Sequence, residues 1–477
     1  MKTKTAKKIK KKDDIFYDRK NGWSIISEKQ KLEIEEYSKR YMSFIGLAKT
    51  EREFHDMSVA MLERFGFKKI DSLKTLKEGD KVYVSEHGKT LFAFIIGKRE
   101  IENGMNIVGA HIDSPRIDIK QNPLYENSEL CYLDTHYYGG IKKYQWLTLP
   151  LALHGVVVKK NGEMVKIVVG EKEGEPVFCI TDLLPHLAQN QMKKTLSEAI
   201  EGENLDILVG SVPLKNKDVK EKVKKNIINI LLKDYGISEK DFISAELEVV
   251  PALKPQELGF DRSMIIAYGQ DDRACAYAAL VAFGEVKDPD YTSCLILVDK
   301  EEIGSYGATG MASNSFEYAV AEVIERYYGA YSDIKLKRSL KNSWMLSADV
   351  NSLFDPLFPS VSEKKNTALM NYGVCVTKYT GRGGKSGASD ANAEFVAQIR
   401  RIFDENKIVW QTGELGKVDE GGGGTIAHYL ARYGMQVVDC GVGLLSMHAP
   451  CEVSSKLDLY MTYKAYYAFY MDSRKVK

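Results

Sequence analysis

The chain has 477 residues, more than one ordinary hydrophobic core holds, so we expect two domains or one large domain with an insertion. Hydrophobic residues make up 44% and charged residues 28%, the balance of a water-soluble globular protein. The formal net charge of +1 gives no overall attraction to nucleic acid or to an anionic membrane, and no apolar run approaches the ~20 residues that span a bilayer. We therefore expect neither a nucleic-acid partner nor a membrane partner.

Two further features bear on the cellular compartment. The lysine-rich start at 1–12 lacks the apolar segment of a signal peptide, and we expect it to be a solvated tail. The seven cysteines are odd in number, show no Cys-x-x-Cys spacing, and several lie in apolar, strand-like runs. This usage is typical of reduced cysteines in a cytoplasmic protein and argues against a thiolate zinc site.

The first part of the chain predicts helices, a hairpin and a strand with polar residues at its end. Apolar residues come at helical spacing over 26–65, and 81–84 with 91–96 predict a hairpin. An apolar strand then runs into His111 and Asp113, which lie on the same side of an extended chain. This spacing suits a metal-bound imidazole oriented by a carboxylate, and equally a histidine with an ordinary hydrogen bond and no ligand role.

The middle of the chain has a different character. Residues 151–158 and 164–169 predict antiparallel strands around Asn161-Gly162, and 181–200 and 215–235 predict amphipathic helices. No cluster of His, Asp and Glu is present there. We expect an inserted, mainly β plus helix domain that serves assembly or encloses the substrate. The predicted parts are a first catalytic segment at 1–120, the insertion at 121–247 and a second catalytic segment at 248–477.

Three later strands also end in acidic or imidazole side chains. Asp271 opens a helix of small residues, and the unpaired N–H groups at a helix start keep a carboxylate ionised. Asp271 is either a helix cap or a carboxylate able to bridge two cations, supported by Asp272 and Arg273. The strand at 343–350 ends at Asp349. The strand at 435–442 is followed by a loop that carries His448.

The strand at 294–298 leads into the adjacent carboxylates of Glu301 and Glu302. Such a pair at the end of a buried strand is costly unless something compensates it. Neighbouring residues of a strand point to opposite sides, so one glutamate can hold a metal while the other acts as a base. The alternative is a solvated loop in which the glycines merely turn the chain.

Strands alternate with helices from residue 264 onward, which predicts an α/β fold with a mixed sheet sandwiched by helices. In such sheets ligands gather beyond the carboxyl ends of the strands. The side chains there are nitrogen and oxygen ligands that suit zinc, or cobalt or manganese, and their number suits two ions that share one carboxylate. The five expected ligands are His111, Asp271, Glu302, Asp349 and His448, with Glu301 beside them.

From about residue 25 to 470 the chain resembles the aminopeptidase I / aspartyl aminopeptidase family of di-zinc exopeptidases. The resemblance rests on Gly109-Ala-His-Ile-Asp-Ser-Pro, Asp271, Glu301-Glu-Ile-Gly-Ser, Ser347-Ala-Asp and Leu445-Ser-Met-His. It implies a zinc-exopeptidase fold, of the phosphorylase/hydrolase-like type, and a tetrahedral homododecamer built from dimers through the insertion. It also implies the following roles: one ion held by His111 and Asp349, the other by Glu302 and His448, with Asp271 as the bridge, Glu301 as the general base and Asp113 supporting His111.

The implied activity is that of a metallo-aminopeptidase, which removes the first residue of peptides with a free amino terminus by a water activated between two metal ions. Two other functions stay open: a di-zinc carboxypeptidase or N-deacylase on the same fold, and a non-catalytic assembly scaffold. Acceptance of acetylated peptides would distinguish a deacylase from an aminopeptidase.

One segment departs from the family pattern. Tyr138-Gly-Gly is typically followed in the family by a histidine that helps to bind the substrate carbonyl; here Tyr144 takes its place, while Trp146 is retained. Lys143, Gln145 or Tyr144 itself could supply a donor instead, and so could His136. The departure leaves the metal ligands intact and the side-chain preference open.

Overall fold

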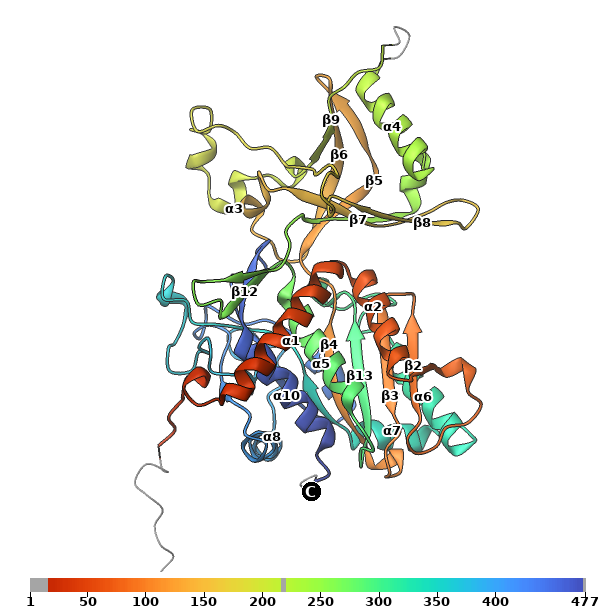
Figure 1. Ribbon diagram of the computed structural model, residues 1–477, viewed down its shortest axis with the longest axis vertical. Helices are drawn as coiled ribbons and strands as arrows, with labels where there is room; N and C mark the ends of the chain where they lie inside the picture. Colours follow the sequence, from red (N-terminus) through yellow and green to blue (C-terminus); the bar gives the residue numbers. More distant parts are fainter. Residues whose placement is uncertain (1–15, 216–219, 475–477) are drawn as a thin grey trace, which may run out of the picture.

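The computed structural model describes residues 16–215 and 220–474, so the predicted tail at 1–12 lies outside the described residues. Figure 1 shows a large layered α/β body below and a smaller body of strands and helices above it. Among the described residues, none of the helices combines the length and apolar character needed to cross a bilayer.

A nine-stranded mixed sheet forms the centre of the large body. Its four inner strands, β13, β4, β14 and β18, run parallel, so their carboxyl ends meet at one edge. Every residue of β13 and β4 is buried, as expected for strands covered on both faces. In spatial order the strands are β1 (Lys68–Lys69), β2 (Lys81–Glu86), β3 (Thr90–Ile95), β13 (Thr292–Val298), β4 (Met105–His111), β14 (Trp344–Ser347), β18 (Gln436–Gly441), β16 (Val374–Thr377) and β17 (Trp410–Thr412).

Helices cover both faces of this sheet and enclose two separate cores. Along β4, Val108 belongs to the core under α1, α2, α5, α8 and α10, while its neighbour Ile107 belongs to the core under α6, α7 and α9. The predicted mixed sheet sandwiched by helices is therefore confirmed. The helices of this body are α1 (Glu28–Leu47), α2 (Glu51–Arg64), α5 (Gln270–Glu285), α6 (Ser315–Tyr328), α7 (Asp333–Lys341), α8 (Ala393–Glu405), α9 (Ala427–Ala431) and α10 (Lys456–Met471).

The predicted helical stretch at 26–65 is confirmed as two helices with a short break. Ser27 caps α1 and Thr50 caps α2, each through a capping box completed by the side chain three residues on. The predicted hairpin is also confirmed, as the antiparallel pair β2 and β3.

A separate five-stranded sheet in the large body carries the segments that lead to Asp271 and His448. Strand β12 runs directly into the start of α5, and β19 and β20 flank the loop that holds His448. The sheet order is β11 (Gln256–Leu258), β12 (Met264–Ala267), β20 (Glu452–Ser455), β19 (Gly443–Leu445) and β15 (Asn351–Ser352).

The smaller body is a six-stranded antiparallel sheet with its own apolar core, and α4 (Lys222–Tyr235) packs on it. It begins at Arg116 and ends at Pro251, and the expected insertion at 121–247 lies within this span. The hairpin around Asn161-Gly162 forms as predicted. The strands, in spatial order, are β8 (Met164–Val169), β7 (Leu151–Val158), β10 (Ala245–Pro251), β5 (Arg116–Asn127), β6 (Leu130–Tyr138) and β9 (Ile207–Gly210).

The predicted helix at 181–200 is wrong. The structure forms only a short 3-10 turn at Gln191–Lys193 and the four-residue α3 (Leu196–Ala199). Pro185 interrupts the stretch, and most of its leucines stay exposed to solvent: Leu187 is 68% exposed, while Ile200 is buried in the core of the smaller body. Short amphipathic helices depend on the packing of their apolar face for their stability.

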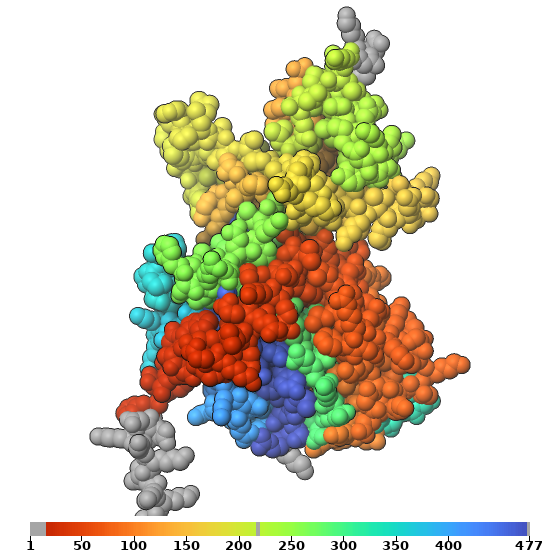
Figure 2. Space-filling view, viewed as in Figure 1, coloured from red at the N-terminus to blue at the C-terminus, as the bar shows by residue number. Residues whose placement is uncertain are grey.

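The smaller body sits directly on the N-terminal helices of the large body (Figure 2). A charged cluster of His154, Glu53, Glu171 and Lys49 joins the two bodies. His154 on β7 has Nδ1 3.0 Å from Glu53 Oε1 on α2 and Nε2 3.0 Å from Glu171 Oε1. Lys49 Nζ lies 2.5 Å from the same Glu171 oxygen. Burial opposes protonation of the imidazole, but the two carboxylates outweigh it and raise the pKa of His154 above 6.5.

His154→Gln removes the imidazolium and leaves the buried carboxylate of Glu53 without its charged partner, because Lys49 pairs with Glu171, so we expect the free energy of unfolding to fall by about 3 kcal/mol near neutral pH. Because the native pKa of His154 is raised, its contribution is complete below its unfolded-state pKa of about 6.5 and is lost as pH rises through the raised value. Urea unfolding of both proteins should therefore give a smaller difference in alkaline than in mildly acidic buffer.

The matched control is His136→Gln, which changes an exposed histidine on β6 and should leave the unfolding curve unchanged. Equal stability of the His154→Gln protein and the wild type in mildly acidic buffer would contradict a stabilising role for this cluster.

Candidate active site

A cleft of about 810 Å³ lies beyond the carboxyl ends of the central parallel strands. Residues that follow strands β4, β13 and β14 line one part of the cleft. The start of α5 and the loop that carries His448, both next to strands of the five-stranded sheet, line another part. All the residues predicted to hold or face a metal line this one cleft: His111, Asp271, Glu301, Glu302, Asp349 and His448.

Asp271 stands between the two imidazoles. Its Oδ1 lies 3.2 Å from His111 Nε2, and its Oδ2 lies 3.3 Å from His448 Nε2. His111 Nε2 is also 4.0 Å from Asp349 Oδ1, and His448 Nε2 is 3.6 Å from Glu302 Oε2. One carboxylate thus presents a separate oxygen to each half of the cluster.

Glu301 faces the His111 half, with its Oε2 4.0 Å from His111 Nε2. Burial raises the pKa of Glu301 to about 7, and neighbouring carboxylates add to the effect. A carboxylate with a pKa near neutrality can both take and return a proton at physiological pH.

The donor set and its charge fit metal ions. Three groups of described side chains each hold their ligand atoms within 4.8 Å of one another: His111 with Asp272 and Asp349, Asp271 with Glu302 and His448, and His111 with Glu301 and Glu302. The buried Glu302 Oε1 accepts no hydrogen bond from the described residues. A buried carboxylate oxygen without a donor is destabilising, and a bound cation satisfies it.

The pKa values also indicate an excess of negative charge. Burial raises the pKa of Glu302 and of Asp349 well above the usual range for carboxyl groups. Burial opposes protonation of His448, but Asp271 and Glu302 outweigh it and raise the pKa of His448 to about 10. The carboxylates outnumber the imidazoles that could balance them, and a divalent cation relieves this imbalance.

Asp113 lies beside the cluster and holds three of its members. Its backbone carbonyl oxygen lies 3.0 Å from His111 Nδ1, and its Oδ1 lies 3.2 Å from the same nitrogen. The carboxylate also accepts the backbone N–H groups of Glu301 at 3.1 Å and Glu302 at 3.2 Å. The hydroxyl of Tyr138 donates to Asp113 Oδ2 at 2.7 Å. Asp113 therefore orients the imidazole and the glutamate pair together.

Asp272 and Arg273, expected to support Asp271, are both fully buried. The guanidinium of Arg273 donates to the backbone carbonyls of Gly269 at 2.7 Å and Tyr268 at 3.0 Å, and also to that of Ala48. It fixes the backbone that precedes Asp271.

Sequence reasoning missed Glu452 and the role of Gly140. Glu452 accepts the backbone N–H of Asp271 at 3.0 Å and of His448 at 2.8 Å. The carbonyl of Gly140 accepts the Nδ1–H of His448 at 2.9 Å, which leaves Nε2 for the cluster. The Tyr138-Gly-Gly motif was a signal for Gly140, whereas nothing in the sequence pattern marked Glu452.

The segment that departs from the family pattern lies in the cleft of the same chain. Tyr144 and Gln145 line the cleft, together with Lys142. Lys143 and His136, the other expected replacements, are absent from the described lining. The glycine run Gly422–Gly424 also lines the cleft. The next residue, Thr425, donates a hydrogen bond to Asp439 at 2.7 Å, which holds the end of this run at the cleft.

A carboxylate- and imidazole-lined cleft at the strand ends of an α/β sheet defines a metal-dependent hydrolase. The family model of the aminopeptidase I zinc metalloproteases (M18) matches residues 44–470, and the chain belongs to this family. It is a zinc-dependent aminopeptidase, as the sequence motifs predicted.

The similarity to known proteins runs over nearly the whole chain. The chain is 54% identical over 461 residues to a probable M18 family aminopeptidase 1 of Clostridium acetobutylicum, covering 96% of this chain and 99% of that protein. The crystal structure of an M18 aminopeptidase from Thermotoga maritima matches with a TM-score of 0.92 and 44% identity, covering 95% and 99%. That of aminopeptidase I from Clostridium acetobutylicum gives 0.90 and 50%, covering 96% and 100%. The predicted zinc-exopeptidase fold is confirmed.

Zinc removal should destabilise the native state, because a ligand that binds only the folded protein adds to its stability. We expect a chelator to lower the unfolding temperature by about 3 °C or more and added zinc to restore it. Asp271→Asn removes the charge shared by the two imidazoles and should lose most of this zinc effect. Differential scanning calorimetry with and without zinc measures it.

Asp355→Asn is the matched control, because Asp355 lines the same cleft and is not among the predicted ligands. It should keep the full zinc effect. An Asp271→Asn protein stabilised by zinc as strongly as the wild type would contradict the assignment.

Proposed function

We propose that this aminopeptidase binds two zinc ions that share Asp271, and that Glu301 is its general base. The observation that carries the proposal is the position of Asp271, whose two oxygens lie 3.2 Å and 3.3 Å from two different imidazoles. In this proposal, one ion is held by His111 and Asp349 and the other by Glu302 and His448.

The proposed mechanism assigns the proton transfers to Glu301. Bound zinc supplies a Lewis acid that makes a water more acidic and a peptide carbonyl more electrophilic. Glu301 takes the proton of the attacking water at its carboxylate and returns it to the leaving nitrogen, for which a pKa of about 7 is well suited. Asp113 keeps His111 and the Glu301 backbone in place during these transfers.

The negative charge of the cleft also supports a substrate with a free amino terminus. Its described lining also includes Asp355, a carboxylate that is not among the proposed zinc ligands and that attracts an α-ammonium group. Peptides with a free amino terminus should therefore be cleaved and acetylated ones refused.

A panel of aminoacyl-p-nitroanilides with and without an amino-terminal acetyl group tests this, in protein that was chelated and then reloaded with zinc. Release of p-nitroaniline from unblocked substrates alone is expected. Cleavage of acetylated substrates would favour an N-deacylase, and inactivity toward every unblocked substrate would contradict the proposal.

Glu301→Gln keeps the shape of the side chain and removes its proton-accepting ability, so kcat should fall by about 10³-fold. Zinc content, measured by atomic emission, should stay unchanged, because this variant leaves the proposed ligands in place. Full turnover with normal zinc content would rule Glu301 out as the base.

We further propose that the protein forms a homododecamer built from dimers through the smaller body, in the cytoplasm. The exposed side chains of Leu183, Leu184, Leu187 and Leu196, each more than half accessible, support an interface there. All seven cysteines are free, which supports a reducing compartment. A solved yeast relative described as a dodecamer is 24% identical, a likeness that shows the fold alone.

Analytical ultracentrifugation of wild type and Leu187→Asp tests the assembly: a smaller particle is expected for the variant.

A further inference from the structure

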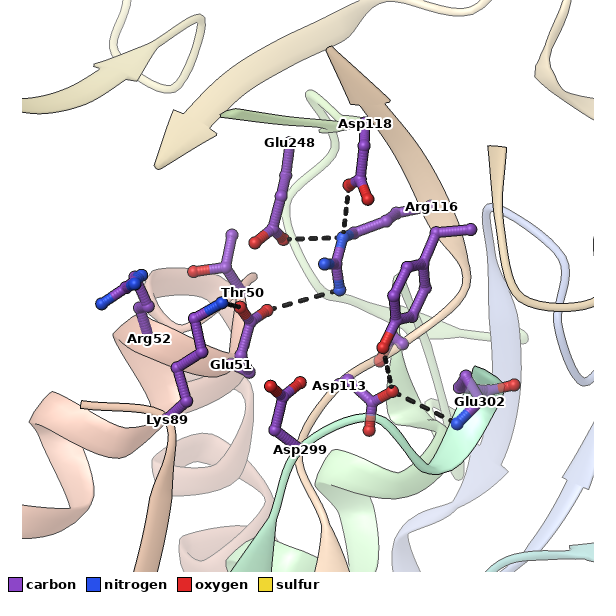
Figure 3. Close-up of polar contacts among 12 residues, drawn as sticks. Thr50, Glu51, Arg52, Lys89, Asp113, Arg116, Asp118, Glu248, Asp299 and Glu302 are labelled. Carbon is purple, nitrogen blue, oxygen red and sulfur yellow. Dashed lines mark hydrogen bonds and ion pairs between the residues drawn. The ribbon is translucent and has the colours of Figure 1, made fainter. Parts of the chain in front are cut away.

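A buried arginine at the start of β5 is fixed from several sides. The Nε of Arg116 lies 2.8 Å from Asp118 Oδ1 and 3.2 Å from Glu248 Oε2, and its Nη1 lies 3.3 Å from Glu51 Oε2 (Figure 3). These carboxylates belong to β5, β10 and α2. Burial opposes ionisation of Glu51, but Arg116 and Lys89 outweigh it and lower the pKa of Glu51 to about 2. The guanidinium is therefore held in one orientation by both bodies of the protein.

This guanidinium lies over the ring of Tyr138, with its central carbon 3.9 Å from the ring centroid. Tyr138 is the register partner of Arg116 on the neighbouring strand β6. A cation held over an aromatic face restrains the ring that it covers. The phenolic oxygen of Tyr138 is thereby held against Asp113, to which it donates a hydrogen bond of 2.7 Å.

Asp113 has no other anchor outside the active site among the described residues. Its remaining side-chain contacts are His111 Nδ1 and the backbone N–H groups of Glu301 and Glu302, which are themselves parts of the cluster. If the carboxylate of Asp113 turned, both backbone N–H contacts and the approach to His111 Nδ1 would be lost together, and only the backbone carbonyl of Asp113, 3.0 Å from that nitrogen, would still hold the imidazole. The Tyr138 hydroxyl is the contact that sets this carboxylate from outside.

The same turn of chain touches the cluster at two more points. Gly139 has φ +73°, and a Cβ there would lie 3.3 Å from Glu302 Cβ. The next residue, Gly140, holds the imidazole of His448 through its carbonyl. The end of β6 is thus built close against the glutamate pair and the second imidazole.

We propose that Tyr138, held by Arg116, is a positioning residue for the aminopeptidase reaction. It fixes the Asp113 carboxylate, which in turn holds the backbone of Glu301 and Glu302 and lies 3.2 Å from His111 Nδ1. The inference rests on the proposed roles of those residues. The six-stranded sheet then contributes to the chemistry within its own chain as well as to assembly.

Tyr138→Phe tests the inference, because it deletes one oxygen and keeps the ring under Arg116. We expect kcat to fall about tenfold with KM changed less than about twofold, since Tyr138 is absent from the described lining of the cleft. Zinc affinity, measured by competition with a chromogenic chelator, should weaken about tenfold, because partners that orient a metal ligand contribute on this scale. A purely structural role would lower the unfolding temperature of the zinc-free protein without these two effects.

The matched control is Tyr137→Phe, which deletes the same oxygen from the adjacent residue, 42% exposed. It should match the wild type in kcat, zinc affinity and unfolding temperature. Arg116→Lys is the second variant: it keeps the positive charge among the carboxylates and loses the planar group over the ring. It should lower kcat and zinc affinity in the same direction as Tyr138→Phe.

The outcomes separate this inference from the proposed function. Wild-type kcat and zinc affinity in Tyr138→Phe, together with an inactive Glu301→Gln protein, would overturn the positioning role alone. Full turnover in Glu301→Gln would overturn the proposed base whatever Tyr138→Phe does. If Tyr138→Phe does not fold, wild-type kcat and zinc affinity in Arg116→Lys would overturn the inference.

Discussion

The shared carboxylate of Asp271 is the constraint around which the rest of the structure is arranged. Its two oxygens must reach imidazoles that come from different sheets, His111 at the end of β4 and His448 in the loop before β20. The four parallel inner strands bring one set of side chains to a common edge, and the five-stranded sheet brings the other set against it. Glu452 joins them, since it accepts backbone N–H groups next to both Asp271 and His448.

The location of the site was predictable because it depends on local patterns. Buried strands are visible as apolar runs, and the polar residue after each run, such as His111, Glu302 or Asp349, lies at the carboxyl edge of a parallel sheet. The family motifs then added roles that no spacing could give. The residues that hold the site were harder to predict. Glu452 and Arg116 act through partners far away in the sequence, and a lone charged residue in a strand carries no sign of such a partner.

The failed helix at 181–200 shows a limit of periodicity. The apolar residues recur at helical intervals, yet Pro185 breaks the pattern and the leucines face outward in this single chain. A stretch whose apolar face is meant for another molecule gives the same signal as one that packs on its own core. By contrast, the hairpin around Asn161-Gly162 formed as expected, because its turn chemistry is contained in two adjacent residues.

The order in which the chain is synthesised gives the split site a further meaning. His111 is made early, the glutamate pair and Asp349 much later, and His448 and Glu452 last of all. A growing chain that has already folded its central strands still lacks one imidazole and the glutamate that holds Asp271 in place. An unfinished chain therefore cannot assemble the complete set of imidazoles and carboxylates that lines the cleft.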